Sequence, residues 1–455
     1  MPKKKTALTI EERLQQALVP AEEQPYEVPE NWVWVRLGGI TQVIGGGTPS
    51  TSKKEYYDGG TISWLSPVDL SNYNDIYISR GNKMITLEGL NNSSAKLLPK
   101  DTVCLTSRAP IGYVAIAENE LSTNQGFKSF LPSPTYLARF LYWYLKGNKE
   151  LLESKASGTT FLELSASKAA TIEFPLPPLS EQQRIVERIE ELFAKLDEAK
   201  ERLQEVADSF AMRKAAILHK AFTGELTKQW RRENGVSDAS WEDASLDSVC
   251  KSIYDGDHMP PPKSETGIPF LVISNVNTGF ISFEKCRFVP EEYYDALSET
   301  RTPEMGDILY TIVGSYGIPV MVDTDKKFCF QRHMALLKSS NIYNRFLWRQ
   351  LQTQSFFEQA TSIATGTAQL TVPIKGLRKL IVKCPSLPEQ HEIVRLIDDL
   401  LARECAAQQA AEQALASIDL MKKSILARAF RGELGTNKAS EASALELLRQ
   451  VLAEN

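Results

Sequence analysis

The sequence contains 455 residues, of which 42% are hydrophobic and 24% are charged, a composition that is ordinary for globular protein and a length that predicts two or three domains. No apolar run reaches the roughly 18 residues of a membrane span, and the basic start lacks the apolar core of a signal peptide, so we expect a cytoplasmic protein. The net charge of −5 argues against a lone, non-specific nucleic-acid binder, and the scattered cysteines and histidines favour neither a disulfide framework nor a zinc site.

The first elements are predicted to be a short helix and then a globular domain. Thr9 and Glu12 have the spacing of a capping box, which predicts a helix to about Leu18 within an N-terminal segment of residues 1–27. Residues 28–176 are rich in Gly, Pro, Ser and Thr, with short β-type runs and one aromatic, helical stretch. This pattern predicts a mixed α/β domain with irregular sheets and long loops.

A long helix is predicted over residues 177–230. Its apolar residues recur in alternating steps of four and three from Ile185 to Phe210, which is the heptad seam of a coiled coil. Ser180 and Gln183 predict a capping box at its start, and Gly224 predicts a left-handed C-cap at its end. So narrow a stripe favours packing on a second long helix over packing on a neighbouring globular domain.

The remaining elements repeat this order. Residues 240–384 are predicted to form a second mixed α/β domain, and residues 385–436 a second long helix that Pro388 opens. The seam of this helix contains several alanines and is interrupted once, by Glu404. Residues 437–455 are predicted to form a helical tail, and this tail and the N-terminal helix are expected to pack near the helix pair and close the repeat into a ring.

The two halves are copies of one design. Leu179-Ser180-Glu181-Gln182-Gln183 recurs as Leu387-Pro388-Glu389-Gln390-His391, and the Gly-Glu-Leu motif at Gly224 recurs at Gly432. Both pairs of motifs are 208 residues apart, so the helices between them have kept one length, as a spacer requires. We therefore predict two irregular mixed α/β domains, separated by two long helices that form an antiparallel coiled coil, in a pseudo-twofold tandem repeat.

Motifs of catalysis are missing from the sequence. There is no phosphate-binding loop of the Walker type, and Gly45-Gly46-Gly47 lacks the spacing of a dinucleotide fingerprint, so it is interpreted as a loop. The run from Asp257 to Pro262 is a poor imitation of an amino-methyltransferase motif because its aromatic residue is missing. The sequence therefore favours binding and organisation over catalysis.

Several motifs carry a resemblance to a known family. These are Gly46-Gly47-Thr48-Pro49-Ser50 with the following Tyr57 to Trp64, Gly267 to Leu271 leading to Asn275-Val276, and the twin motifs of the long helices. With them the chain resembles the specificity subunit of a type I restriction-modification system. The resemblance implies two target-recognition domains that each read one half of an asymmetric bipartite DNA site. It also implies a helical pair that sets their spacing and docks two copies of a methylation subunit.

The same resemblance implies where the chemistry resides. This chain would be non-catalytic and would hold no cofactor. S-adenosylmethionine would belong to the methylation subunits, and ATP and Mg to motor-nuclease subunits. Residues 28–176 carry 14 Lys and Arg against 13 Asp and Glu, and residues 240–384 carry 15 against 16. Because neither domain has a large positive excess, we expect the isolated chain to bind DNA weakly.

Candidate DNA contacts come from polar clusters that interrupt β-type runs at matched places in both halves. Arg recognises guanine, and Asn or Gln recognises adenine, through hydrogen bonds to base edges. The alternative for each residue is an ordinary role in a turn or on the surface. Base-contacting candidates are Arg108, Asn124 and Gln125 in the first domain, with Thr159 and Thr160 near the backbone, and Tyr316, Gln331, Arg332 and His333 in the second, with Thr367 and Gln369; phosphate-contacting candidates are Lys53, Lys54 and Lys263.

The starts of the long helices supply a second candidate site. Glu181, Gln182, Glu389 and Gln390 either help to dock a methylation subunit or, through their carboxylates, complement the positive helix N-terminus. Two other functions stay open from the residues alone. One is a single-chain DNA methyltransferase or nuclease, and the other is a coiled-coil scaffold whose domains bind proteins.

Overall fold

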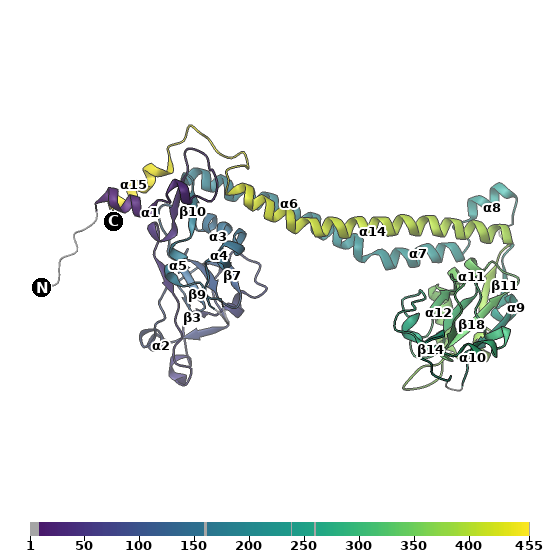
Figure 1. The fold of residues 1–455 in the computed structure, drawn as a ribbon. Coiled ribbons are helices and arrows are strands. Elements are labelled where there is room, and N and C mark those ends of the chain that lie inside the picture. The colour runs from purple at the N-terminus through teal and green to yellow at the C-terminus, as the bar shows by residue number, and fades with distance from the viewer. Residues whose placement is uncertain (1–8, 159–161, 238, 259–260, 455) are drawn as a thin grey trace. The chain divides into compact units, whose positions relative to one another are not determined.

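The computed structural model describes residues 9–158, 162–237, 239–258 and 261–454 (Figure 1). The chain divides into two compact units, one made of residues 1–202 and 414–455 and the other of residues 203–413. Each unit contains one α/β domain, which we call the first head (residues 28–176) and the second head (residues 240–384), together with parts of the long helices.

The first head is built on a five-stranded sheet of order β2-β9-β6-β7-β4. Neighbouring strands in this sheet are antiparallel, except that β4 runs parallel to β7. A three-stranded sheet β5-β3-β8 and a two-stranded ribbon β1-β10 complete the head. The strands are β1 (Val33–Arg36), β2 (Val43–Gly45), β3 (Ile62–Leu65), β4 (Tyr77–Ile78), β5 (Lys83–Ile85), β6 (Val103–Ser107), β7 (Ile111–Ala117), β8 (Ser122–Thr123), β9 (Phe127–Phe130) and β10 (Glu173–Leu176), and the helices are α2 (Leu87–Asn91), α3 (Ala138–Gly147), α4 (Lys149–Lys155) and α5 (Ala166–Ala170).

The second head repeats this plan with one strand fewer in its main sheet. Its sheets have the orders β12-β18-β15-β16, β14-β13-β17 and β11-β19. Each matches a sheet of the first head in chain order, except that β4 has no counterpart, and the predicted tandem repeat of mixed α/β domains is thereby confirmed. The strands are β11 (Glu242–Ser245), β12 (Cys250–Asp255), β13 (Ile268–Leu271), β14 (Arg287–Val289), β15 (Ile308–Thr311), β16 (Pro319–Met321), β17 (Cys329–Phe330), β18 (Met334–Ser339) and β19 (Ile381–Cys384), and the helices are α9 (Leu246–Val249), α10 (Glu291–Asp295), α11 (Asn344–Leu351), α12 (Gln354–Ser362) and α13 (Ile374–Leu377).

The long helices are α6 (Leu179–Asp208), α7 (Phe210–Phe222) and α14 (Leu387–Ala429). The first predicted helix, over residues 177–230, is therefore not continuous, since a turn at Ser209 separates α6 from α7 and residues 223–227 precede α8 (Lys228–Asn234). The predicted C-cap at Gly224 is confirmed by its positive φ of 78°. The predicted capping box at Ser180 does not form, because α6 starts one residue earlier and the Ser180 hydroxyl donates to Glu441, 2.9 Å away.

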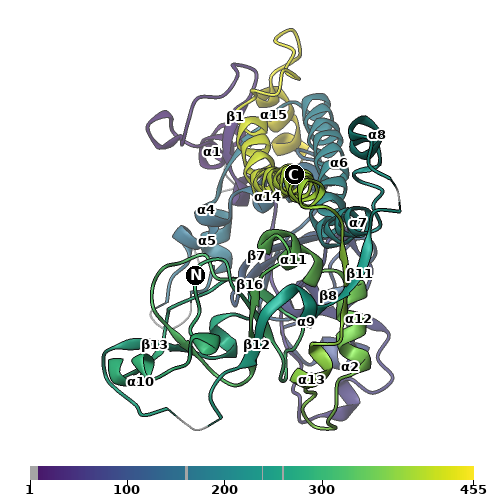
Figure 2. The same cartoon turned by 90° about the vertical axis from the view of Figure 1, so that its right-hand side faces the viewer.

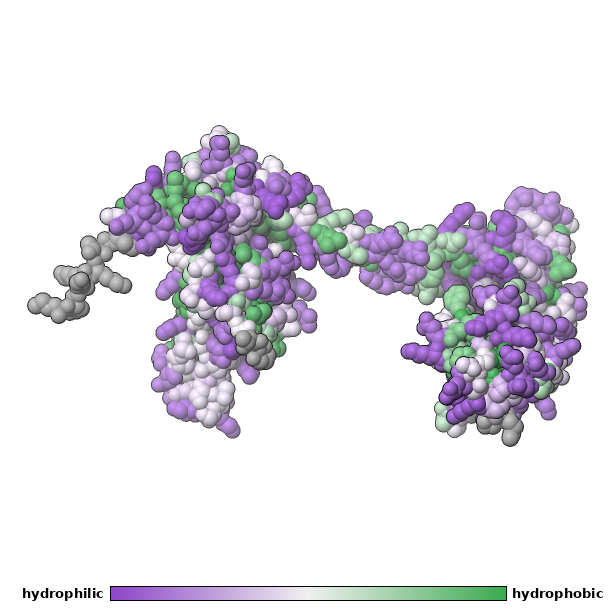
Figure 3. All heavy atoms as spheres, viewed as in Figure 1, coloured by the Kyte–Doolittle hydropathy of each residue, from purple (hydrophilic) through white to green (hydrophobic). Residues whose placement is uncertain are grey.

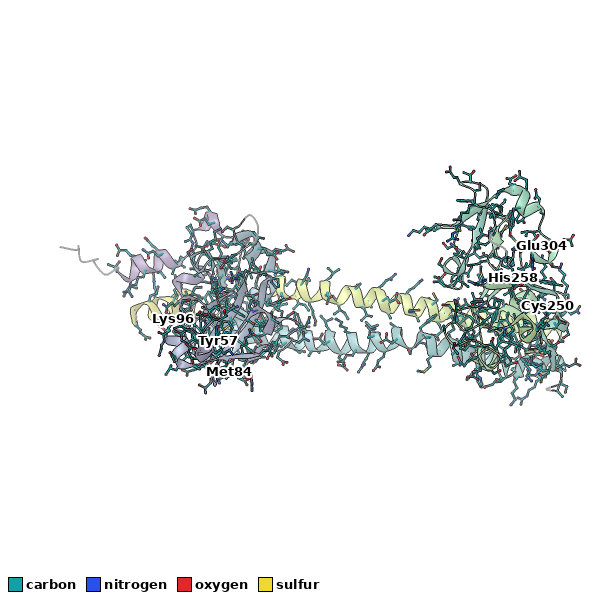
Figure 4. All side chains as sticks on the ribbon, turned by 90° about the horizontal axis from the view of Figure 1, so that it is seen from below. Tyr57, Met84, Lys96, Cys250, His258 and Glu304 are labelled. Carbon is teal, nitrogen blue, oxygen red and sulfur yellow. The ribbon has the colours of Figure 1, made fainter. Side chains whose placement is uncertain are left out.

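In the first unit, α6 and the last part of α14 lie side by side (Figure 4), and the ion pairs of residues 197 with 422 and 184 with 441 show that the two segments run antiparallel. Lys422 of α14 forms an ion pair with Asp197 of α6 and also lies over the Phe193 ring, 5.0 Å from its centre. The starts and ends of the helices pack differently. Ile185 and Ile189 of α6 and Phe430, just after α14, belong to the hydrophobic core of the first head, with the Phe430 and Phe140 rings 5.2 Å apart.

The second unit has the equivalent arrangement. Phe222 at the end of α7 packs on Phe346 of α11, with ring centres 5.2 Å apart, and Ile393 and Ile397 of α14 lie in the same core. Glu404, which interrupts the predicted seam, forms an ion pair with Arg213 of α7. At this one position an ion pair, and not an apolar contact, links α7 and α14.

The two ends of the described chain pack together in the first unit. α1 (Ile10–Ala17) begins with the predicted capping box at Thr9, and α15 (Ala444–Glu454) lies beside it. The backbone N–H of Ala444 donates to the Asn31 carbonyl at 3.0 Å, and Arg13 donates to the Leu452 carbonyl at 3.4 Å. The expectation that these two helical segments meet is confirmed.

Candidate nucleic-acid interface

Three loops of the first head are held together by backbone hydrogen bonds at the end of β6. We call residues 107–110, 124–126, 157–158 and 162–164 the first loop cluster. The N–H of Ser107 donates to the Gly126 carbonyl at 2.7 Å, and the N–H of Leu164 donates to the Ser107 carbonyl at 2.9 Å. Segments that are 57 residues apart in sequence, from 107 to 164, are thereby fixed at one place.

The second head holds three loops by the same bonds. The second loop cluster consists of residues 312–317, 331–333 and 365–371. The N–H of Ile312 donates to the His333 carbonyl at 2.9 Å, and the N–H of Val372 donates to the Ile312 carbonyl at 2.8 Å. Ile312 therefore stands where Ser107 stands in the first head, and His333 where Gly126 stands.

This equivalence extends through the whole central loop. The N–H of Asn124 donates to the Leu65 carbonyl at 2.8 Å, as that of Gln331 does to the Leu271 carbonyl at 2.9 Å. One backbone frame thus carries Asn-Gln-Gly at 124–126 in one head and Gln-Arg-His at 331–333 in the other. The predicted matching of these places is seen in the structure, and the side chains they present differ.

The first-head candidates differ in how free their side chains are. Arg108 is partly exposed, and its guanidinium lies 4.0 Å from the Glu163 carboxylate. Gln125 is exposed and accepts a hydrogen bond from the Thr48 hydroxyl. The Asn124 side-chain oxygen accepts the Gly126 N–H at 2.8 Å, which is an Asx turn and fits the ordinary structural role. The candidates Thr159 and Thr160 lie outside the described residues.

Lys128 is a member of this site that the sequence reasoning missed. Its side chain is only 9% exposed, and its ammonium donates to the Ser107 hydroxyl at 3.1 Å, to the Gln125 carbonyl at 3.3 Å and to Glu163 at 3.4 Å. One buried charge therefore links all three loops of the first cluster. The available signal was a lysine within the otherwise buried strand β9, where a charge is rare without partners.

Three second-head candidates line one cavity of about 400 Å³, namely Arg332, His333 and Gln369. Asp255 and His258, which were not predicted, share its lining and lie 2.9 Å apart (Figure 4 labels His258). Burial, with Arg332 nearby, lowers the pKa of the His333 imidazole below its usual value, so His333 is neutral at pH 7 and offers one donor and one acceptor.

The other second-head candidates lie around this cavity or apart from it. Gln331 is half-buried, and Thr367 is exposed in the third loop. Tyr316 is stacked on Phe357, with ring centres 5.5 Å apart, and its hydroxyl donates to Thr361 at 3.1 Å. Tyr316 is therefore already engaged within the head, unlike the exposed Arg332.

The lysine candidates are on the surface. Lys53 donates to the Tyr56 hydroxyl at 3.0 Å and lies over its ring, and this hydrogen bond raises the pKa of Lys53. Lys54 and Lys263 are exposed. Exposed lysine side chains of this kind suit contacts to DNA phosphates.

A glycine in each head allows the chain to pass closely over the central loop. A Cβ atom on Gly46 would lie 1.9 Å from the Asn124 carbonyl oxygen, and one on Gly256 would lie 2.3 Å from the Phe330 carbonyl oxygen. Only glycine fits such an approach. In the first head, this passage brings Thr48 to Gln125.

The four residues at the helix starts are buried and have partners inside the chain. Glu181 accepts from the Thr436 hydroxyl at 2.6 Å, and Glu389 accepts from the Thr227 hydroxyl at 2.7 Å. Gln182 and Gln390 accept the backbone N–H groups that precede α3 and α11, each at 2.8 Å. These contacts fix each helix start to its head and to the end of the antiparallel partner, and they leave almost no side-chain surface for another subunit.

Two kinds of feature are absent from the part of the chain that the structure describes. No three His, Cys, Asp or Glu side chains among the described residues are grouped so that they could hold a metal ion. None of the helices that these residues form is both long and apolar enough to cross a membrane.

Known proteins similar to this chain agree on one family. The sequence profile of the type I restriction modification DNA specificity domain matches residues 29–208 and 239–415. The MjaIX specificity subunit from Methanocaldococcus jannaschii is 42% identical over 83% of this chain and 88% of its own length. The EcoKI specificity subunit from Escherichia coli is 24% identical over 94% and 96%. The crystal structure of the HsdS subunit from Thermoanaerobacter tengcongensis shares the fold, with a TM-score of 0.62 and 20% identity over 90% of this chain and all of its own.

Proposed function

Because the chain belongs to the type I restriction-modification DNA specificity family and is thus a DNA-recognition subunit without a catalytic role, we propose that each head reads one half of an asymmetric bipartite DNA site through its loop cluster. The observation that carries this proposal is the shared backbone frame with different side chains at 124–126 and 331–333. Two equivalent frames with unlike donors and acceptors would read two unlike half-sites, whereas identical heads would read a palindrome.

The residues of each cluster favour different contacts. In the first head, Arg108 and Gln125 present a guanidinium and an amide, which match guanine and adenine edges. In the second head, Arg332 stands at the place of Gln125, and the neutral His333 and Gln369 line the cavity beside it. Lys53, Lys54 and Lys263 would then contact phosphates, and such contacts add affinity without sequence preference.

We further propose that the long helices set the number of unread base pairs between the half-sites. The second head packs on the start of α14, through Ile393 and Ile397. The first head packs on the end of α14, through Leu426 and Phe430. The 43 residues of α14 would be about 65 Å long in a straight helix. Insertion of one heptad into both α14 and α6 adds about 10 Å, which corresponds to about three base pairs.

A solved structure with this fold is described in terms of complex assembly of the type I R-M system, and the surface of the long helices is suited to such assembly. Met212 on α7 is 75% exposed, and Leu420 on α14 is 67% exposed, so apolar side chains remain uncovered there. Figure 3 shows such hydrophobic residues along the helices. We propose that two methylation subunits, which carry S-adenosylmethionine, dock on these helices, and that motor-nuclease subunits with ATP and Mg join them.

The reading by the heads can be tested by exchanging side chains between the equivalent frames. Replacing Gln125→Arg together with Gly126→His gives the first head the side chains of the second at two places. In the complex assembled with its methylation subunits, sequencing of methylated adenines should then show a changed sequence in one half-site only. A matched control is Lys54→Gln, which should lower overall methylation without altering the sequence. An unchanged sequence after the exchange, in a complex that still methylates, would refute the proposal.

A further inference from the structure

The main sheets of the two heads end differently. In the first head the edge is closed by β4, which runs parallel to β7. The N–H of Ile116 in β7 donates to the Ile76 carbonyl at 2.8 Å, and the N–H of Glu118 donates to the Ile78 carbonyl at 3.0 Å. In the second head the corresponding sheet ends at β16, and within the described residues no strand pairs with its outer side. β16 is labelled in Figure 2.

Met321 of β16 is the equivalent of Ile116, since the two stand opposite Ile308 and Val103 in their ladders. The N–H of Val322 donates to the Asp307 carbonyl at 2.8 Å, so Val322 and Asp307 form a hydrogen-bonded pair of the antiparallel ladder between β16 and β15. The neighbouring pair, with Met321, is then of the other type, and its N–H and C=O point away from β15. The donor that binds β4 in the first head thus faces outward in the second.

A cavity of about 510 Å³ lies beside this open edge. Phe280 and Met305 line it and are 68% and 63% exposed, which is unusual for large apolar side chains. Met321 and Trp348 also contribute, and the Trp348 indole donates to the Pro319 carbonyl at 3.2 Å, at the start of the strand. An unpaired strand edge with apolar side chains beside it is the surface that a peptide strand binds.

The chain's own counterpart of β4 lies near this edge but does not pair with it, because other contacts hold it. The segment 276–286 takes the place in the second head that carries β4 in the first. Asn275, which directly precedes the segment, binds its later part, because the Asn275 carbonyl accepts the Ser282 N–H at 2.8 Å and the Asn275 side chain donates to the Glu284 carbonyl at 3.1 Å. Ile281 and Phe283 pack into the core of the head. The segment therefore is not free to pair with β16, and a strand that does so comes from another chain.

The charges and the position indicate what kind of chain it is. Asp323, which follows β16 and lines the cavity, is exposed, and a carboxylate there opposes a DNA phosphate. Arg345 also lines the cavity and lies 3.2 Å from Asp398 of α14, so one residue of the cavity wall contacts the long helix. That helix is the surface on which the methylation subunit is proposed to dock.

We infer that β16 accepts an extended segment of the methylation subunit as an added parallel strand, with an apolar side chain of that segment on Phe280 and Met305. The inference rests on the proposed function, because it requires the chain to work in the assembled complex. The parallel direction follows from β4, which binds the equivalent edge of the first head in that sense. With the added strand, the main sheet of the second head would have five strands in the same arrangement as the main sheet of the first head.

Hydrogen exchange with the purified methylation subunit tests this inference. On assembly, the amides of Met321 and Asp323 should exchange at least about tenfold more slowly, because each gains a hydrogen bond. Met321→Pro removes the outward donor while leaving the bonds to β15, and it should weaken binding of the methylation subunit by about tenfold. Phe280→Ser, which changes no backbone group, should weaken it as well. Leu87→Ser, at a 63% exposed position of the first head, is the matched control and should have no effect.

Three results would overturn the inference. One is unchanged exchange of Met321 and Asp323 in a fully assembled complex. The others are slowing by DNA alone, which would make DNA the occupant, and slowing that depends only on the concentration of the chain, which would indicate a second copy. Sequencing of the sites methylated by the Phe280→Ser complex keeps the two proposals separate. If the methylated sequence does not depend on the side chains of the loop clusters, the proposal that the heads read the DNA is refuted, whatever the hydrogen exchange at β16 shows.

Discussion

Replacement of Lys128 by methionine should relax recognition of one half-site and leave the other unchanged. The ammonium of Lys128 links the three loops of the first cluster through Ser107, Gln125 and Glu163, and the side chain is 9% exposed. The equivalent place in the second head is occupied by Ala335. The second cluster is therefore held without such a lysine, and the substitution acts on one head alone.

The size of the effect follows from the contacts. A hydrogen bond to a charged group contributes about 1.5–3 kcal/mol, but the desolvation of a buried ammonium opposes this gain and the three contacts are not additive. Glu163 is 44% exposed and is solvated when Lys128 is lost, and the Ser107 hydroxyl keeps its bond to the Gly126 carbonyl. We therefore expect the arrangement of the loops to lose about 1–3 kcal/mol, or about 5- to 150-fold in its population.

The assay is sequencing of methylated adenines produced by the assembled complex, with binding to matched and mismatched oligonucleotides as a second readout. Lys128→Met should lower discrimination at the half-site read by the first head by about 5- to 150-fold. Lys54→Met, at an exposed lysine of the same head, should reduce binding to all sequences alike and lower its salt dependence. Equal loss at both half-sites, or full discrimination in a folded Lys128→Met complex, would refute the reasoning.

Three further substitutions test packing, close approach and titration. Phe430→Ala should destabilise the first unit by about 3–5 kcal/mol in native-state hydrogen exchange, because the ring lies within the core of the first head, while Leu420→Ala should change it by less than about 0.5 kcal/mol. Gly256→Ala should lower the free energy of unfolding of the second unit by about 1–3 kcal/mol in urea titrations, since its Cβ would meet the Phe330 carbonyl; an unchanged free energy would contradict the close approach. The lowered pKa of His333 makes the unfolded chain bind more protons as the pH falls below about 6.5, so urea stability should decrease from pH 7 to pH 5.5 in the wild type and less in His333→Gln; equal slopes would contradict the assignment.

Periodicity and repetition were enough to predict the architecture. The alternating steps of the seam are a local property, because side chains three and four residues apart share one helix face. The constant separation of 208 residues showed that one helix length occurs twice. The cap at Gly224 was equally predictable, since a positive φ favours glycine in any context.

Where local rules met tertiary packing, the local prediction was sometimes wrong. Ser180 has a capping-box partner in sequence, yet its hydroxyl donates to Glu441, which is 261 residues away. Glu404 interrupts the apolar seam in the sequence, but in the structure it forms an ion pair with Arg213 of the facing helix. The seam itself is partly open, with Val206 38% exposed, because two helices cover less of each other than a larger bundle would.

The sequence alone thus determined the tandem repeat, the two long helices and the polar stretches from which the candidate contacts come, because each of these is written in the spacing of near neighbours. Only the tertiary structure decided that Ser107, Gln125 and Glu163 meet around Lys128, that Glu181 and Glu389 are buried, and that β16 has an open edge where β7 is paired. Such contacts join residues tens to hundreds of positions apart, and no local preference specifies which distant groups will meet once the sheets and helices pack.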